Sequence, residues 1–173
     1  MEITTDQITQ VFDEHYAGLC RFLTSIVGGT RAPEIAQDSF LRLCQAELGS
    51  VSNSEMKFWL FRVARNLALN EVKKRNTRTR LWVRITDAVS GTVRGPSEIL
   101  ERSEEHKRVR ELLGKLPEHQ RSALLLREHE EMSYREIAVV LAVSESKVRI
   151  DIYRGRVALR RMWNKEEMNN GQQ

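Results

Sequence analysis

The side chains best suited to binding a charged partner lie on a helix-forming segment that begins near Glu145 and ends near Trp163. Val148 and Ile152 give this segment an apolar side on which it can pack. Arg and Lys bind phosphate oxygens, and side chains near the start of a helix can reach base edges in a major groove. The opposite side is therefore suited to duplex DNA, and it carries Ser146, Lys147, Arg149, Ile150, Tyr153, Arg154, Val157 and Arg161.

The preceding residues have the order of a helix-turn-helix. Ser133 and Glu136 match a capping box that opens a short helix, with the small Ala138 where two helices would cross. Ala142 and Val143 then break the pattern before Ser144, which can cap the basic helix. The alternative is a solvated amphipathic helix in an ordinary bundle. The capping box, small residue, turn and basic helix occur together, which favours the helix-turn-helix.

A second basic group follows an earlier predicted helix that starts at a Ser52–Glu55 capping box. This helix also carries amides and aromatic rings, which can receive unstacked bases while basic groups follow the phosphates. Aromatic residues more often pack in a core, so this group alone is a weak indication of nucleic-acid binding. It supports nucleic-acid binding only together with the basic helix that begins near Glu145. The basic group is Lys73, Lys74, Arg75, Arg78, Arg80 and Arg84, and the helix before it carries Phe58, Trp59, Phe61, Arg62, Arg65, Asn66 and Asn70.

Helical periodicity dominates the chain, so we predict an all-α protein made of two small helical domains. Only 9 Gly and 3 Pro occur among 173 residues, which disfavours a turn-rich sheet. The first helix is capped by Thr5 or Asp6 and ended by Gly28, and a second helix opens at Pro33. The predicted boundaries are residues 1–76 for the first domain, 77–103 for a linker, 104–165 for the second domain and 166–173 for a polar tail.

Composition narrows the function classes. No apolar run is long enough for a membrane span, and the start of the chain does not resemble a signal peptide, so we expect a cytoplasmic protein. We expect Cys20 and Cys44 to be packed inside. The four His residues lack a metal-ligand spacing, and no nucleophile–base pair is evident. We therefore predict no metal, no cofactor, no small-molecule substrate and no catalytic site.

Four segments resemble motifs of the extracytoplasmic-function (ECF, group IV) sigma factors of the sigma-70 family. Residues 34–42 read EIAQDSFLR, residues 58–68 read FWLFRVARNLA, residues 116–121 read LPEHQR and residues 133–138 read SYREIA. Each motif is moderately specific, but their order and separations match the family over nearly the whole chain. The alternative interpretation is a free-standing helix-turn-helix regulator, which predicts a dimer and a palindromic operator.

The resemblance implies two promoter-binding regions and several partners. Region 2 binds the β′ clamp helices of core RNA polymerase and melts the −10 element, and region 4 reads the −35 element and contacts the β flap. An anti-sigma factor, often membrane-anchored, commonly holds members inactive. By position, core polymerase binding falls to Gln37, Asp38, Phe40 and Leu41; −10 contacts fall to Asn53, Arg62, Arg65, Asn66, Asn70, Lys73 and Lys74; and −35 contacts fall to Lys147, Arg149, Ile150, Tyr153 and Arg154.

Besides Cys44, which replaces an aromatic residue often found at the end of the polymerase-binding helix, three positions of the second domain depart from the family pattern. Asp151 puts an acid where a phosphate-binding Arg is common, and Ile150 replaces a hydroxyl residue. Ala142 stands at a turn position that is often Gly. These departures predict an altered −35 preference and the loss of one phosphate contact.

Overall fold

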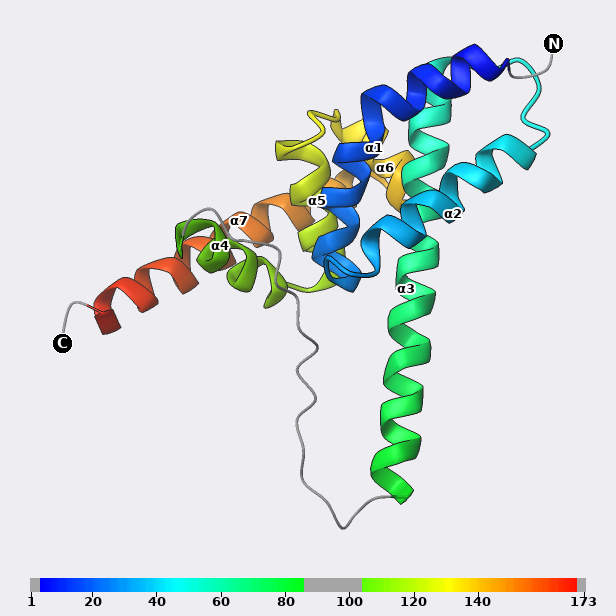
Figure 1. The fold of residues 1–173 in the computed structure, drawn as a ribbon. Coiled ribbons are helices and arrows are strands. Elements are labelled where there is room, and N and C mark those ends of the chain that lie inside the picture. Colours follow the sequence, from blue (N-terminus) through cyan, green and yellow to red (C-terminus); the bar gives the residue numbers. More distant parts are fainter. Residues whose placement is uncertain (1–3, 86–103, 171–173) are drawn as a thin grey trace.

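The computed structural model describes residues 4–85 and 104–170, with side chains placed in 4–77 and 107–168. Within those residues every regular element is an α-helix, which confirms the predicted all-α class. Figure 1 shows the helices as two adjoining bundles. The helices are α1 (Thr5–Val27), α2 (Ala32–Gln45), α3 (Asn53–Ile85), α4 (Glu104–Gly114), α5 (Glu118–Glu128), α6 (Tyr134–Leu141) and α7 (Glu145–Asn170).

Helices α1, α2 and α3 form the N-terminal bundle, and each packs against the other two. Its core contains fully buried Leu19, Leu60 and Phe61, whose removal from water is the main source of its stability. Gly28 ends α1 with a positive φ of 87°, as predicted. The N-cap is Thr4 rather than Thr5 or Asp6, because Thr4 shares a reciprocal capping box with the Gln7 side chain.

Helix α3 runs further than the sequence predicted. It continues to Ile85 as one helix of 33 residues, through the first part of the segment taken as linker. No Gly or Pro interrupts the chain between Asn53 and Gly91, so nothing in the backbone stops the helix earlier. Figure 1 shows the later turns of α3 projecting away from the bundle. Residues 86–103 of the predicted linker lie outside the described residues.

Helices α4 to α7 form the C-terminal bundle, in which α6 and α7 make the predicted helix-turn-helix. The Ser133–Glu136 capping box is present, and Ala142 ends α6 in the left-handed conformation with φ 55°. That conformation strains a residue with a Cβ, which explains the frequent Gly at this turn. Gly155 lets α7 cross α5 closely, because a Cβ there would lie 2.6 Å from Leu124 Cδ1.

The two bundles are in contact with one another. Helix α3 packs on α6, and α1 packs on α4 and α5. Figure 1 shows α5 lying beside α1. The described part of the chain therefore forms one closed body in which elements far apart in sequence share an interface.

Candidate nucleic-acid interfaces

The predicted −35 residues form one exposed surface, called here the α7 face. The buried stripe of α7 is Val148 and Ile152, and it holds the helix on α5 and α6. The outer side is left to solvent, with Tyr153 70% exposed and Ile150 45% exposed. The structure thus brings together all five predicted residues, namely Lys147, Arg149, Ile150, Tyr153 and Arg154.

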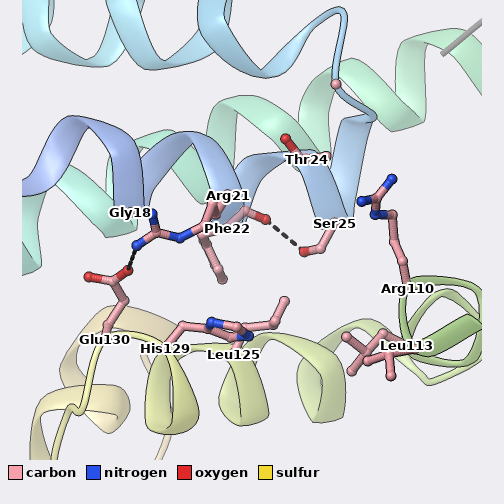
Figure 2. Close-up of a pocket in the computed structure, with 12 residues that line it drawn as sticks. Gly18, Arg21, Phe22, Thr24, Ser25, Arg110, Leu113, Leu125, His129 and Glu130 are labelled. Carbon is pink, nitrogen blue, oxygen red and sulfur yellow. Dashed lines mark hydrogen bonds and ion pairs between the residues drawn. The ribbon is translucent and has the colours of Figure 1, made fainter. Parts of the chain in front are cut away.

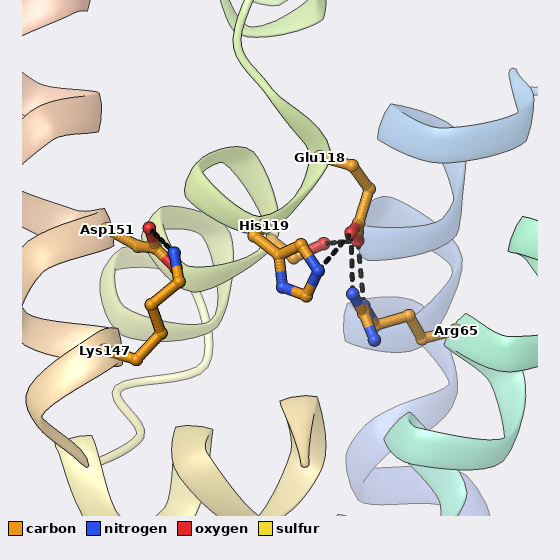
Figure 3. A network of polar contacts seen from close by, with 6 residues as sticks. Arg65, Glu118, His119, Lys147 and Asp151 are labelled. Carbon is orange, nitrogen blue, oxygen red and sulfur yellow. Dashed lines mark hydrogen bonds and ion pairs between the residues drawn. The ribbon is translucent and has the colours of Figure 1, made fainter. Parts of the chain in front are cut away.

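Two side chains of the α7 face are held in place by neighbours. The Arg149 guanidinium carbon lies 4.7 Å from the centroid of the Tyr134 ring on α6, a cation–π distance. The Lys147 ammonium binds the carboxylate of Asp151 one turn later. Figure 3 shows this pair on α7. Both contacts restrict long basic side chains that otherwise have many rotamers.

Asp151 corrects the sequence prediction. It was expected to put an acid on the DNA-reading surface, but its exposed fraction is 1% and it faces the interior. Its Oδ2 is buried without a hydrogen-bond partner. The spacing in the sequence indicates this burial. Asp151 follows Val148 by three residues and directly precedes Ile152, so it lies on the same buried stripe of the helix. Asp151 therefore does not oppose a DNA phosphate.

The predicted −10 residues on α3 are divided between two environments. We call the full set, Arg62, Arg65, Asn66, Asn70, Lys73 and Lys74, the α3 face. Asn66, Asn70, Lys73 and Lys74 are exposed. The last three of these line a hollow of about 650 Å³ between α2 and α3, together with Asp38. Asn53 lies apart at the start of α3, where its Nδ2 donates to Gln10 Oε1 at 2.9 Å.

Arg65 is buried against the C-terminal bundle, with 5% of its surface exposed. Its Nε donates to Glu118 Oε1 at 2.8 Å, and its Nη2 donates to Glu118 Oε2 at 2.6 Å. The Ser122 hydroxyl donates to the same Oε1 at 2.6 Å. Figure 3 shows α3 and α5 joined by this network. Arg62 also contacts the C-terminal bundle, where its Nε donates to the Val139 carbonyl oxygen at 3.1 Å.

The ionisation of Glu118 follows from this geometry. Burial raises the pKa of its carboxyl group, but the hydrogen bonds from Arg65 and Ser122 outweigh burial. The net result is a Glu118 pKa below the usual glutamate value. Glu118 is therefore an anion at neutral pH and a strong acceptor for the Arg65 guanidinium.

Glu130, in the loop after α5, makes a looser contact with the N-terminal bundle. Its carboxylate lies 3.8 Å from Lys57 Nζ and 4.0 Å from Arg21 Nη2. Burial raises the pKa of the Glu130 carboxyl group, and these distant cations do not fully compensate. Figure 2 shows Arg21 and Glu130 at one end of a pocket of about 410 Å³, which is lined by α1, α4 and α5.

The predicted polymerase-binding residues of α2 are also divided. Gln37, Asp38 and Leu41 are exposed, and Leu41 has 60% of its surface free. Phe40 is 5% exposed and its ring lies 4.9 Å from that of Phe12, so little of this side chain is free for a partner, and its polymerase contact stays a prediction. Phe40 shares the buried side of α2 with Ala36 and holds α2 to α1.

Other predictions concerned the cysteines and metal binding. Cys44 is exposed rather than packed inside, and Cys20 is partly buried. Among the described residues no group of His, Cys, Asp and Glu is placed to hold a metal ion. In the same part of the chain, each helix is too short or too polar to cross a bilayer.

Comparison with known protein families matches both bundles. The model of sigma-70 region 2 matches residues 11–78, and the model of sigma-70 region 4 matches residues 106–159. The first match covers most of the N-terminal bundle and the second covers most of the C-terminal bundle. The chain therefore contains two sigma-70 regions in the order that its motifs predicted.

Individual relatives agree with these matches. RNA polymerase sigma factor YlaC of Bacillus subtilis is 28% identical over 161 residues, which cover 90% of this chain and 91% of that protein. RNA polymerase sigma-H factor of Pseudomonas aeruginosa is 30% identical over 136 residues, which cover 74% of this chain and 70% of that protein. ECF RNA polymerase sigma factor SigM of Bacillus subtilis is 27% identical over 168 residues, covering 91% of this chain and 96% of that protein.

Two solved structures share the fold. The sigma factor RpoE of Bartonella quintana, solved in complex with the anti-sigma factor NepR, superimposes with a TM-score of 0.69 at 21% identity, covering 90% of this chain and 96% of that one. CnrH, solved in complex with the cytosolic domain of CnrY, gives a TM-score of 0.65 at 24% identity, covering 91% of this chain and 88% of that one.

These matches define a two-region transcription initiation factor. The chain belongs to the sigma-70 family of RNA polymerase sigma factors, in its ECF group. The alternative of a free-standing helix-turn-helix regulator is not retained, because that class does not account for a region 2 bundle.

Proposed function

We propose that this ECF sigma factor directs core RNA polymerase to its own promoters by reading −35 duplex with the α7 face and melted −10 DNA with the α3 face. Residues 1–76 serve as the region 2 domain, 77–103 as the linker, 104–165 as the region 4 domain and 166–173 as the tail. The exposed α7 face carries the proposal, because its basic and aromatic side chains gather on the outer side of a docked helix.

The α7 face has the chemistry needed for a major groove. Its buried stripe sets the angle of the helix, and Lys147, Arg149 and Arg154 supply phosphate or base-edge donors. Ile150 and Tyr153 offer apolar contact, which suits a thymine methyl group. Asp151 points inward, so it does not repel a phosphate, but the position still lacks the phosphate-binding Arg, and the predicted loss of one phosphate contact stays a prediction.

The exposed end of the α3 face suits a single strand. Asn66 and Asn70 can bond to base edges while Lys73 and Lys74 follow the phosphates. The hollow beside these residues reaches α2, so a strand bound there would lie near Asp38. Asn53, Arg62 and Arg65 complete the proposed −10 contacts.

The partners follow from the family and from α2. Gln37, Asp38 and Leu41 offer an exposed surface for the β′ clamp helices, and the C-terminal bundle contacts the β flap. An anti-sigma factor, membrane-anchored in many systems, holds the chain inactive; the two similar folds solved with NepR and CnrY support such a partner. The chain acts in the cytoplasm, has no catalytic site of its own, and takes no cofactor or small-molecule substrate.

Reconstitution with core RNA polymerase tests this function. We expect purified full-length chain to bind the core enzyme and to start transcripts at a limited set of sites on a genomic DNA library. The double variant D38A/L41A removes two exposed side chains, so it should remain folded while polymerase affinity falls about tenfold. The control is D13A, which removes an exposed carboxylate of α1.

Two results would contradict the proposal. One is a wild-type chain that leaves core polymerase without promoter-specific transcripts. The other is a D38A/L41A variant with unchanged polymerase affinity, which would remove the assignment of α2. Phe40 is left intact because truncating it would disturb the core of the N-terminal bundle.

A further inference from the structure

The C-terminal bundle sits directly on part of the α3 face. Arg65 is buried and donates to Glu118 of α5, and Arg62, which stays exposed, donates to the Val139 carbonyl oxygen of α6. The remaining members of the face, further along α3, are exposed. One helix thus carries a proposed nucleic-acid surface in which Arg65 is covered, Arg62 is contacted and the other members are open.

The Arg65–Glu118 contact has the form of a phosphate contact. A guanidinium binds a carboxylate or a phosphate by the same fork of two parallel N–H···O bonds. Both Arg65 nitrogens that point to Glu118 are within 2.8 Å of its oxygens. While the pair is intact, Arg65 cannot offer those donors to a DNA strand.

A second group of contacts extends the interface toward α1. Lys57 Nζ donates to the Glu130 carbonyl oxygen at 3.4 Å, and the Glu130 carboxylate lies against α1 at Gly18. A Cβ on Gly18 would clash with the Glu130 carboxylate in its present position, so an Ala at this position requires the carboxylate to move. Two acids of the C-terminal bundle are therefore seated on the N-terminal bundle at separate points.

We infer that the α5–α6 side of the C-terminal bundle competes with the melted −10 strand for Arg65 and the neighbouring Arg62, with Glu118 standing where a phosphate would bind Arg65. The inference rests on the proposed −10 role of Arg62 and Arg65. The α7 face stays exposed in this closed arrangement, so duplex reading is available before single-strand binding. The two bundles must separate before the whole α3 face can bind DNA.

Two variants should open the interface by different means. E118Q keeps the shape of the side chain but removes its charge, and it should shift the closed-to-open ratio roughly tenfold, as expected for one lost charged hydrogen bond. G18A changes no charge, and it displaces the Glu130 carboxylate at the other end of the interface. E128Q is the matched control, because Glu128 pairs with Arg156 inside the C-terminal bundle.

The first measurement is the distance between the bundles in the full-length chain. Dyes are placed on Cys44 of α2 and on the thiol introduced by R135C in α6, in a C20A background, since both positions are exposed. We expect energy transfer to fall in E118Q and G18A and to stay at the parental value in E128Q. Unchanged transfer in both E118Q and G18A would overturn the closed arrangement.

The second measurement is binding of a fluorescent single-stranded oligothymidylate to the same chains. We expect E118Q and G18A to bind several-fold more tightly than E128Q, and R65A to abolish the gain when added to E118Q. If energy transfer falls but affinity matches E128Q, the bundles do separate and the proposed −10 role of Arg65 fails. That result contradicts the competition for Arg65 but not the contact between the bundles in the parental chain. Failure of the closed arrangement and failure of the −10 role therefore give different results.

Discussion

The α3 face and the α7 face are both basic surfaces on long helices, yet only one is free. The α7 face is exposed, because α7 packs on α5 and α6 mainly through its opposite, apolar side. The α3 face is covered at Arg65, because the chain supplies an acid, Glu118, that fits this guanidinium group. Positive charge alone therefore does not make a surface available; the position of the chain's own carboxylates decides it.

The ion pairs of the two faces join residues at very different separations along the sequence. Lys147 pairs with Asp151 four residues away, so that contact fixes a side chain within one helix. Arg65 pairs with Glu118 across 53 residues, so that contact joins two bundles. A local pair orders a reading surface without hiding it, whereas a long-range pair hides the surface and adds stability to the closed chain.

The largest expected effect is that of R65A on stability. It leaves the largely buried Glu118 carboxylate without its main partner, and losing one partner of a buried pair costs about 3 kcal/mol. The free energy of unfolding of the full-length chain, measured with urea, should fall by that order. The control R154A removes an exposed guanidinium of the α7 face and should change it by less than about 0.5 kcal/mol. Equal values for the two variants would mean that Arg65 is not held as described.

The second expected effect is on DNA affinity, where R154A, the control for stability, should be the variant with a clear loss. In holoenzyme, R154A should weaken binding to a −35-containing duplex about tenfold and reduce the magnitude of the salt slope by about 1. K165A is the control, because it removes one exposed charge from the far end of α7. If R154A and K165A behave alike, the α7 face is not the surface that reads duplex DNA.

Local features of both faces could be predicted from the sequence. The Ser133–Glu136 capping box and the Val148–Ile152 stripe are short-range signals, and the structure confirms both of them. The exposure of the α7 face follows from that stripe, because residues half a turn away from a buried stripe must face outward. The five predicted −35 residues therefore lie together as expected.

The long-range features could not be predicted in the same way. Nothing near Arg65 in the sequence indicates that Glu118 will bind it, because the pair forms only after two bundles dock. Asp151 was misplaced for a different reason, since a resemblance assigns roles by position while burial depends on the helix side. The three-residue spacing from Val148 places Asp151 beside the buried stripe.

The smallest expected effect compares the two acids of the interface. The Glu118 pKa is lowered, so its contribution to stability is complete above the usual glutamate value of about 4.3 and is lost as pH falls through the lowered pKa. The Glu130 pKa is raised, so its contribution is complete below the usual value and is lost as pH rises through the raised pKa. The same change of Glu to Gln should therefore have opposite signs at the two positions.

The free energy of unfolding at neutral pH distinguishes the E118Q variant from the E130Q variant. E118Q should lower the free energy of unfolding, because it weakens the bonds with Arg65 and Ser122. E130Q should raise it by less than about 1 kcal/mol, because it removes a buried charge whose partners Lys57 and Arg21 are distant. In acid, where Glu130 is already protonated, the E130Q gain should vanish. A loss of stability in E130Q at neutral pH would show that its long ion pairs hold the bundles together as firmly as the Arg65–Glu118 fork.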